Sequence, residues 1–388
     1  MSAGNPHISN MQIRQLVLAK SVKMLQQINT QTVYPSANPV LNIPVRPVGL
    51  VLRLWIEVIA TLTPGAAAAT LTDTGVGNLL QQVTLADLNN FTRIQTTGQH
   101  LTLLSCLKRR RPLGSTADFN VTTGNNASSP INTPPALWGV WQAPGTIAAN
   151  TAGTVRAVFE VPLAYSDDDL RGAIYANVIN ATMQLGLTLN QNAIVGTGDY
   201  TNAVYQTGAA TAGAFTQATV NVYQEYLDQL PVANGQVLLP PVDMATMYEL
   251  KNTNMAALTP GQDFYIPFSN FRDYHSTILI YNNSGGAAGR ALGTDINYLA
   301  LQASNMTAIE KIDPLFKVLK GRETMQQDLP AGFYYNSYRR KPISTQQFGA
   351  MNIVLNPITA AAGAYVNVYW EDLGLTNMLT GAPALASS

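Results

Sequence analysis

One ten-residue segment occurs twice in this chain, and it restricts the fold more than any other feature. Residues 218–227 read ATVNVYQEYL and residues 364–373 read AYVNVYWEDL, with seven identities at a separation of 146 positions. Two landmarks precede each copy in the same order, an Ile-Pro pair and then a segment ending in Leu-Asn: Ile43-Pro44 with Leu189-Asn190, and Ile266-Pro267 with Leu355-Asn356. The shared order predicts one fold used twice, and 388 residues are enough for two domains.

Alternation of apolar residues indicates that both halves are built from β-strands. Between positions 50 and 60 apolar residues occupy every second position, and Arg53 and Glu57 fall in the other set. A period of two is typical of a half-buried strand, so we expect both charges to lie outside the core. The duplicated strands predict two separate cores, which receive Val220 and Val222 in the first half and Val366 and Val368 in the second.

Helices are expected to be few. Segments 167–177, 243–258 and 295–304 each open on an aspartate that would cap a short helix. The longer first half also requires long loops, for which residues 64–74 and 120–135 have suitable compositions. The predicted fold class is therefore all-β.

The N-terminal segment 11–28 contains no proline or glycine and predicts a basic amphipathic helix. Its charged residues are Arg14, Lys20 and Lys23, and no acidic residue precedes Glu57. Such a helix suits the surface of an anionic membrane, or an arm that docks on a neighbouring subunit. The longest apolar run, residues 48–62, carries two charges and is shorter than the roughly 20 residues of a membrane span, so no span is expected.

The charge content favours a protein that packs against its own copies. Only 11% of residues are charged, and 22 basic residues balance 22 acidic ones. A surface without net charge is poorly suited to a free monomer and lacks the basic excess of a nucleic-acid binder. We therefore expect self-association and no specific nucleic-acid partner.

Residues with catalytic or metal-binding potential are sparse. The three histidines are scattered, Cys106 is the only cysteine, and neither a nucleophile elbow nor a phosphate-binding loop is present. We expect no enzyme activity and no cofactor. The one dense acidic cluster, formed by Ser166, Asp167, Asp168 and Asp169, has two interpretations: a helix cap, or a weaker candidate for binding Ca²⁺.

Three longer segments carry a family resemblance. Val161-Pro-Leu-Ala-Tyr-Ser166, Tyr226-Leu-Asp-Gln-Leu-Pro231 and Gly293-Thr-Asp-Ile-Asn-Tyr-Leu299 resemble, in this order, the major capsid protein of tectiviruses, icosahedral bacteriophages with an internal lipid membrane. The similarity runs from about residue 11 to about Leu373 and departs from the family mostly in the loops.

This resemblance implies a double jelly roll, two eight-stranded sandwiches per chain, and a homotrimer of hexagonal outline in an icosahedral shell. It implies that the basic helix lies on the inner side of the shell near the membrane, and that vertex and minor capsid proteins are further partners. The protein would fold in the cytoplasm of the host bacterium before joining the virion capsid.

The corresponding domain prediction is an N-terminal arm (1–30), a first jelly roll with long loops (31–232), a second jelly roll (233–375) and a flexible tail (376–388). The alternative prediction is a glycan-binding β-sandwich protein, which would need no assembly.

Overall fold

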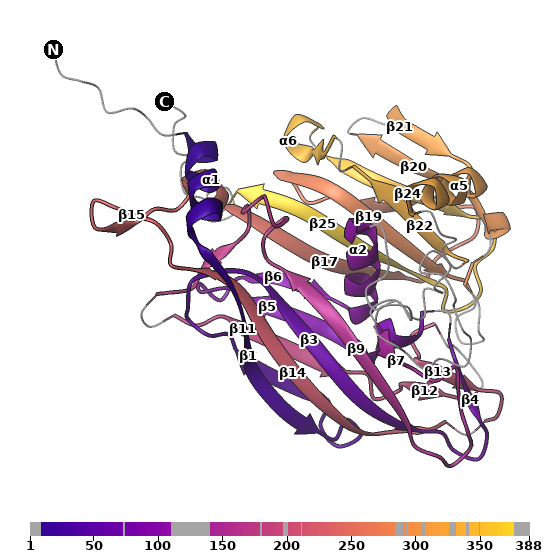
Figure 1. Cartoon of the computed structure of the whole chain (residues 1–388). Coiled ribbons are helices and arrows are strands. Elements are labelled where there is room, and N and C mark those ends of the chain that lie inside the picture. Colours follow the sequence, from indigo (N-terminus) through magenta and orange to yellow (C-terminus); the bar gives the residue numbers. More distant parts are fainter. Residues whose placement is uncertain are drawn as a thin grey trace.

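Alternating apolar residues build two β-sandwiches that lie side by side in the computed structural model (Figure 1). The structure describes residues 9–72, 74–109, 140–178, 181–196, 201–210, 212–283, 290–291, 293–303, 307–325, 331–338, 341–348 and 350–375. The predicted loop 120–135 and the predicted tail 376–388 lie outside these ranges.

The first sandwich has two main sheets. One has the order β1 (Val22–Val33), β14 (Ala214–Asp228), β3 (Leu50–Thr63), β9 (Gly153–Pro162) and β7 (Val140–Gln142), and β10 (Ile174–Tyr175) also pairs with β3. The facing strands have the order β2 (Val40–Pro44), β11 (Gln184–Leu189), β5 (Leu80–Ala86) and β6 (Thr92–Thr96). A small sheet at its edge contains β12 (Ile194–Val195), β13 (Tyr205–Thr207), β4 (Ala69–Leu71) and β8 (Thr146–Ile147).

The second sandwich repeats this plan. One layer has the order β17 (Thr246–Ala256), β25 (Tyr365–Leu375), β19 (Arg272–Asn282) and β22 (Phe333–Ser337), and β23 (Ile343–Ser344) also pairs with β19. The facing layer has the order β18 (Phe264–Pro267), β24 (Met351–Pro357), β20 (Ile296–Ala303) and β21 (Thr307–Ile312). A hairpin of β15 (Val232–Ala233) and β16 (Gln236–Val237) separates the halves.

Both sandwiches therefore have the same strand order. Numbered along the chain, the eight main strands of each are arranged 1-8-3-6 in one layer and 2-7-4-5 in the other. This is the arrangement of a jelly roll, so the fold is a double jelly roll. The repeated ten-residue segment forms the eighth strand of each, β14 and β25. The rolls are joined where β6 runs parallel to β17, with Ile94 opposite Leu250.

Each sandwich has its own hydrophobic core. Val220 and Val222 are fully buried in the core of the first sandwich, and Val366 and Val368 are fully buried in the core of the second. A buried valine side chain stabilises the fold by about 1.5 to 3 kcal/mol relative to an exposed one. The duplicated sequence therefore contributes to two cores that do not share these residues.

Arg53 and Glu57 of β3 lie outside the hydrophobic core, as predicted, but they are not exposed to solvent. Arg53 and Glu57 are 8% and 4% exposed, because polar side chains of the flanking strands β9 and β14 contact them. Partners compensate for the lost hydration: Arg53 Nη1 lies 2.8 Å from Glu160 Oε1, and Arg156 donates to Glu57.

The described helices are α1 (Asn10–Lys20), η1 (Gly75–Leu79), α2 (Gly98–Arg109), α4 (Pro241–Met244), η4 (Gly293–Asp295), α5 (Pro314–Met325) and α6 (Thr345–Phe348). None of them is long and apolar enough to cross a bilayer. The three predicted helices are wrong. Residues 167–177 form turns and β10, and the other two segments contribute one short turn each, α4 and η4, before β17 and β20 begin.

The N-terminal helix is also shorter than predicted. It ends at Lys20, and residues 22–28 belong to β1, which pairs with β14 along its whole length. Pairing within a sheet has overridden the helical pattern of the sequence. The predicted boundary between arm and first sandwich, at residue 30, therefore falls inside the first strand of that sandwich.

Candidate functional site

The apolar side of α1 faces the protein itself. Val17 is fully buried in a small cluster with Leu50, Leu52 and Leu170, and Ile13 packs against the same cluster. Ser9 caps the helix, and its side chain accepts a hydrogen bond from the Gln12 amide. The exposed side of the helix presents the residues Met11, Leu16 and Lys20.

Two of the three predicted membrane-facing cations take part in ion pairs. Arg14 donates from both Nε and Nη2 to the fully buried carboxylate of Asp243, each at 2.6 Å. The hydrogen bond to Asp243 raises the pKa of Arg14. Lys23 lies on β1, with Nζ 2.6 Å from Glu225 Oε1 and 3.4 Å from Asp167 Oδ2. Lys20 and Lys23 are exposed, although Lys23 is paired, whereas Arg14 packs inward against Asp243.

The acidic segment Ser166–Asp169 forms a tight loop, so its prediction as a helix cap is wrong. The Ser166 amide donates to the Asp169 carbonyl, and Asp169 accepts from Arg171 Nε and Nη2. Burial alone would raise the pKa of Asp169, but these hydrogen bonds and the charge of Arg171 lower it. Asp167 forms ion pairs with Arg53 and Lys23.

The cation interpretation of this loop gains no support from its surroundings. Two of its three carboxylates, those of Asp167 and Asp169, already form ion pairs with arginine or lysine side chains. In the described ranges, no group of three or more histidine, cysteine or carboxylate residues is placed to hold a metal.

The functional element that the sequence did not reveal is α2, which follows β6 and packs onto the second sandwich. The His100 ring stacks on Tyr369 at a centroid distance of 4.8 Å, and Thr97 Oγ1 donates to the Tyr369 hydroxyl at 3.1 Å. Leu103 joins a cluster with Ile278, Ile280, Phe333, Tyr335 and Tyr369. We call this contact between α2 and the outer face of β19, β22 and β25 the joint.

Two histidines at the joint are held neutral. Burial lowers the pKa of His100 to about 3, and lowers that of His275 to about 4. His275 lies on β19, and its Nδ1 is 3.0 Å from the hydroxyl of Tyr165, a residue of the first sandwich. The His100 Nδ1 is 2.7 Å from Thr96 Oγ1. Both rings therefore connect the sandwiches as uncharged groups.

Buried charges complete the joint. Glu371 accepts from Ser276 Oγ at 2.6 Å and from the Tyr248 hydroxyl at 2.9 Å, and Lys108 Nζ from α2 lies 3.2 Å away. Beside it Arg272 pairs with Glu249 at 2.6 Å and with Asp372 at 3.2 Å. Burial raises the pKa of Asp372 to about 7.

The sequence carried only a weak signal for these groups. Removing one partner of a buried pair is costly. The pair of Lys108 with Glu371 links α2 to the second sandwich, whereas the pairs of Arg272 lie within the second sandwich. The side chains come from strands that are distant in the sequence, and no local spacing relates them.

Comparisons with known proteins agree with this architecture. Residues 4–230 match the family "P3 major capsid protein N-terminal", and residues 245–386 match "P3 major capsid protein C-terminal". The major capsid protein P3 of Enterobacteria phage PRD1 is 35% identical over 390 residues, covering 98% of this chain and 94% of that protein.

Solved structures with low identity share the fold. The major capsid protein of Sulfolobus Turreted Icosahedral Virus has a TM-score of 0.62 at 13% identity, over 94% of this chain and 100% of that one. The PBCV-1 virus capsid has a TM-score of 0.53 at 12% identity, over 95% and 97%. The two sandwiches share one strand order, both halves match family models, and a relative is 35% identical. The chain therefore belongs to the P3 major capsid protein family.

Proposed function

We propose that this major capsid protein assembles as a homotrimer of hexagonal outline, and that the trimers form an icosahedral shell around an internal lipid membrane. The observation that carries the proposal is the repeated strand order, because two similar sandwiches in each of three chains give six similar units around one axis. The low charge content and zero net charge are compatible with the large interfaces that such assembly requires.

Mass photometry of the purified protein tests the trimer. We expect a single main species with the mass of three chains at submicromolar concentration. A protein that remains monomeric at tens of micromolar would contradict the proposal. Electron micrographs of assembled particles test the shell, and particles without a lipid layer would contradict the internal membrane.

The end of the molecule that carries α1 is proposed to face the membrane. Met11, Leu16 and Lys20 are its exposed candidates, since Arg14 and Lys23 are paired within the protein. Two apolar side chains and a cation suit an anionic bilayer surface, although they bind weakly as a single copy and gain strength in a shell of many copies.

Sedimentation with anionic vesicles tests this contact. The triple variant Met11→Ser, Leu16→Ser, Lys20→Gln should lose most of the binding. The control Ile358→Ser, which replaces an exposed residue between β24 and β25, should retain it. Equal binding by both variants would show that α1 does not face the membrane.

The remaining partners are proposed from family membership. Neighbouring trimers would contact one another in the shell, vertex and minor capsid proteins would occupy other positions, and no specific nucleic acid is expected. Folding in the host cytoplasm would precede incorporation into the virion.

An amide-lined cleft favours glycan binding as a second candidate function. The cleft has a volume of about 600 Å³, and the described residues that line it include seven asparagines and no charged side chain. Gln99 in its wall is 5% exposed, and its Nε2 has no hydrogen-bond acceptor among the described residues. Asparagine and glutamine side chains both donate and accept hydrogen bonds, so they can bind the hydroxyl groups of a neutral sugar. Saturable, sugar-specific retention on a glycan array would support this function, and an array without signal would contradict it.

A further inference from the structure

Two helices occupy equivalent positions in the two sandwiches. Both α2 and α5 have 12 residues, and each begins two positions after the end of the fifth strand of its sandwich, β6 or β21. Each also contacts equivalent elements: α2 touches η1, β5 and β9, and α5 touches η4, β20 and β22. The first turns match as well, because the Leu101 amide donates to the Thr97 carbonyl and the Lys317 amide to the Asp313 carbonyl.

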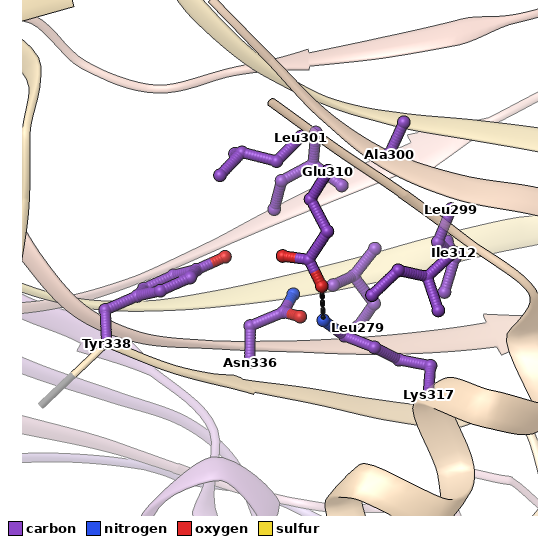
Figure 2. A pocket seen from close by; sticks show the side chains of 10 residues that line it. Leu279, Leu299, Ala300, Leu301, Glu310, Ile312, Lys317, Asn336 and Tyr338 are labelled. Carbon is purple, nitrogen blue, oxygen red and sulfur yellow. Dashed lines mark hydrogen bonds and ion pairs between the residues drawn. The ribbon is translucent and has the colours of Figure 1, made fainter. Parts of the chain in front are cut away.

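This register places the inner sides of the helices in equivalent surroundings. Leu101 is buried in the first core. Its counterpart Lys317 points into the second sandwich, where Nζ lies 3.3 Å from Glu310 Oε1 beside the core residues Leu279 and Leu301 (Figure 2). Burial lowers the pKa of Lys317. Both helices therefore cover their own sandwich with the same side.

The outer sides of the helices differ in one respect. On α2 the outer residues are Gln99, His100 and Leu103, and all three are buried against the second sandwich at the joint. The equivalent positions on α5 are Leu315, Phe316 and Leu319, which are 58%, 52% and 57% exposed. Three large apolar side chains on one helix face form a patch that a soluble monomer seldom leaves uncovered.

The surface that would receive this patch is identified by the sequence repeat. Within the chain, α2 rests on Tyr369 of β25 and on Ile278 beside it. Tyr223 is equivalent to Tyr369 in the ten-residue repeat, and Trp55 pairs with Tyr223 as Ile278 pairs with Tyr369. Tyr223, Trp55 and the nearby Val158 lie on the outer face of the first sandwich and are half-buried. We call this the β14 face.

We infer that α5 of one copy packs onto the β14 face of the next copy, repeating between chains the joint that α2 makes within each chain. The inference rests on the proposed homotrimer and names its contact. The contact is head-to-tail: each copy gives α5 to one neighbour and receives α5 from the other. Three copies close such a ring, so six joints, three internal and three between chains, surround one axis.

The head-to-tail geometry allows a mixing experiment. Phe316→Asp alters the helix patch and leaves the β14 face intact, whereas Tyr223→Lys alters the face and leaves the helix intact. Alone, each variant should be monomeric. The concentration at which trimers form should rise at least about 30-fold, because each variant loses a central aromatic contact. An equal mixture retains one intact pair of surfaces and should give a species with the mass of two chains.

Mass photometry distinguishes the outcomes. If the unmodified protein is trimeric and both variants remain trimeric, the α5 contact is wrong and the trimer stands. If the unmodified protein is monomeric, the proposed function itself fails. Monomeric variants whose mixture gives no heterodimer would also overturn the head-to-tail contact. Leu319→Lys, on the same face of α5, replaces Phe316→Asp if that variant does not fold, and Ile358→Asp is the exposed-site control.

Discussion

The neutral His100 at the joint makes stability depend on pH. Its pKa is about 3 in the folded protein and 6.5 in the unfolded chain, so the stability it contributes is fully present above pH 6.5 and is lost as the pH falls toward 3. A pH of 5 lies about 1.5 units below the pKa of the unfolded chain, so His100 is protonated in the unfolded chain and neutral in the folded protein. Protonation therefore stabilises the unfolded chain by about 2 kcal/mol at this pH. Burial is the main cause, with the charge of Lys108 acting in the same direction and that of Glu371 opposing it.

The variant His100→Gln tests this value, because glutamine can keep the hydrogen bond to Thr96 and does not titrate. Urea titrations at pH 7 and pH 5 give the free energy of unfolding of both proteins at one protein concentration. The unmodified protein should lose about 2 kcal/mol more than the variant between the two pH values. Equal losses would refute the reasoning, since they would mean that His100 is protonated in the folded joint. Adding His275→Gln should reduce the pH dependence further, by a similar amount.

Three further substitutions test the packing. Val368→Ala should lower the free energy of unfolding by about 2 kcal/mol, because it removes two buried methyl groups. The control Gln217→Ala, at an exposed position, should change it by less than about 0.5 kcal/mol. Glu249→Gln should cost about 3 kcal/mol or more in the same urea assay, since it removes a charge partner of the buried Arg272; a loss below 1 kcal/mol would show that Asp372 suffices. Gly172→Ala should lower the melting temperature, because Gly172 has φ +91° and a Cβ there would lie 2.4 Å from the Leu163 carbonyl oxygen. Gly208→Ala should leave the melting temperature unchanged, because a Cβ at Gly208 would meet no atom within 4 Å.

The sequence predicted what is local and periodic. Strand alternation and the repeat indicated two β-sandwiches, because side-chain period and burial are linked along a single strand. The helix over 11–28 was extended too far because the partner of residues 22–28 is β14, nearly 200 residues away in sequence. The burial of Arg53 and Glu57 was missed for a related reason: a period of two shows which residues share a face, but it does not show what covers that face.

The joint was beyond the reach of the sequence. His100 is a lone histidine in sequence, and its role follows from Tyr369, which lies on a strand of the other sandwich. Both sides of α2 are covered, one by each sandwich, and the residues that cover its outer side lie on distant strands. The exposed residues of α5 suggest a contact with a neighbouring copy only when α5 is compared with α2 on the fold.

The position of β1 also affects how the chain is made. Val22 pairs with Asp228, so the first strand leaves the ribosome about 200 residues before the strand that pairs with it. At 5 to 20 residues per second this delay is roughly 10 to 40 s, far longer than a hairpin needs to form. For that time an edge-forming segment with Val22, Met24 and Leu25 is without its native neighbour. Slower translation between β2 and β14 should therefore increase aggregation of the nascent chain, whereas slower translation after β14 should have little effect on the first sandwich.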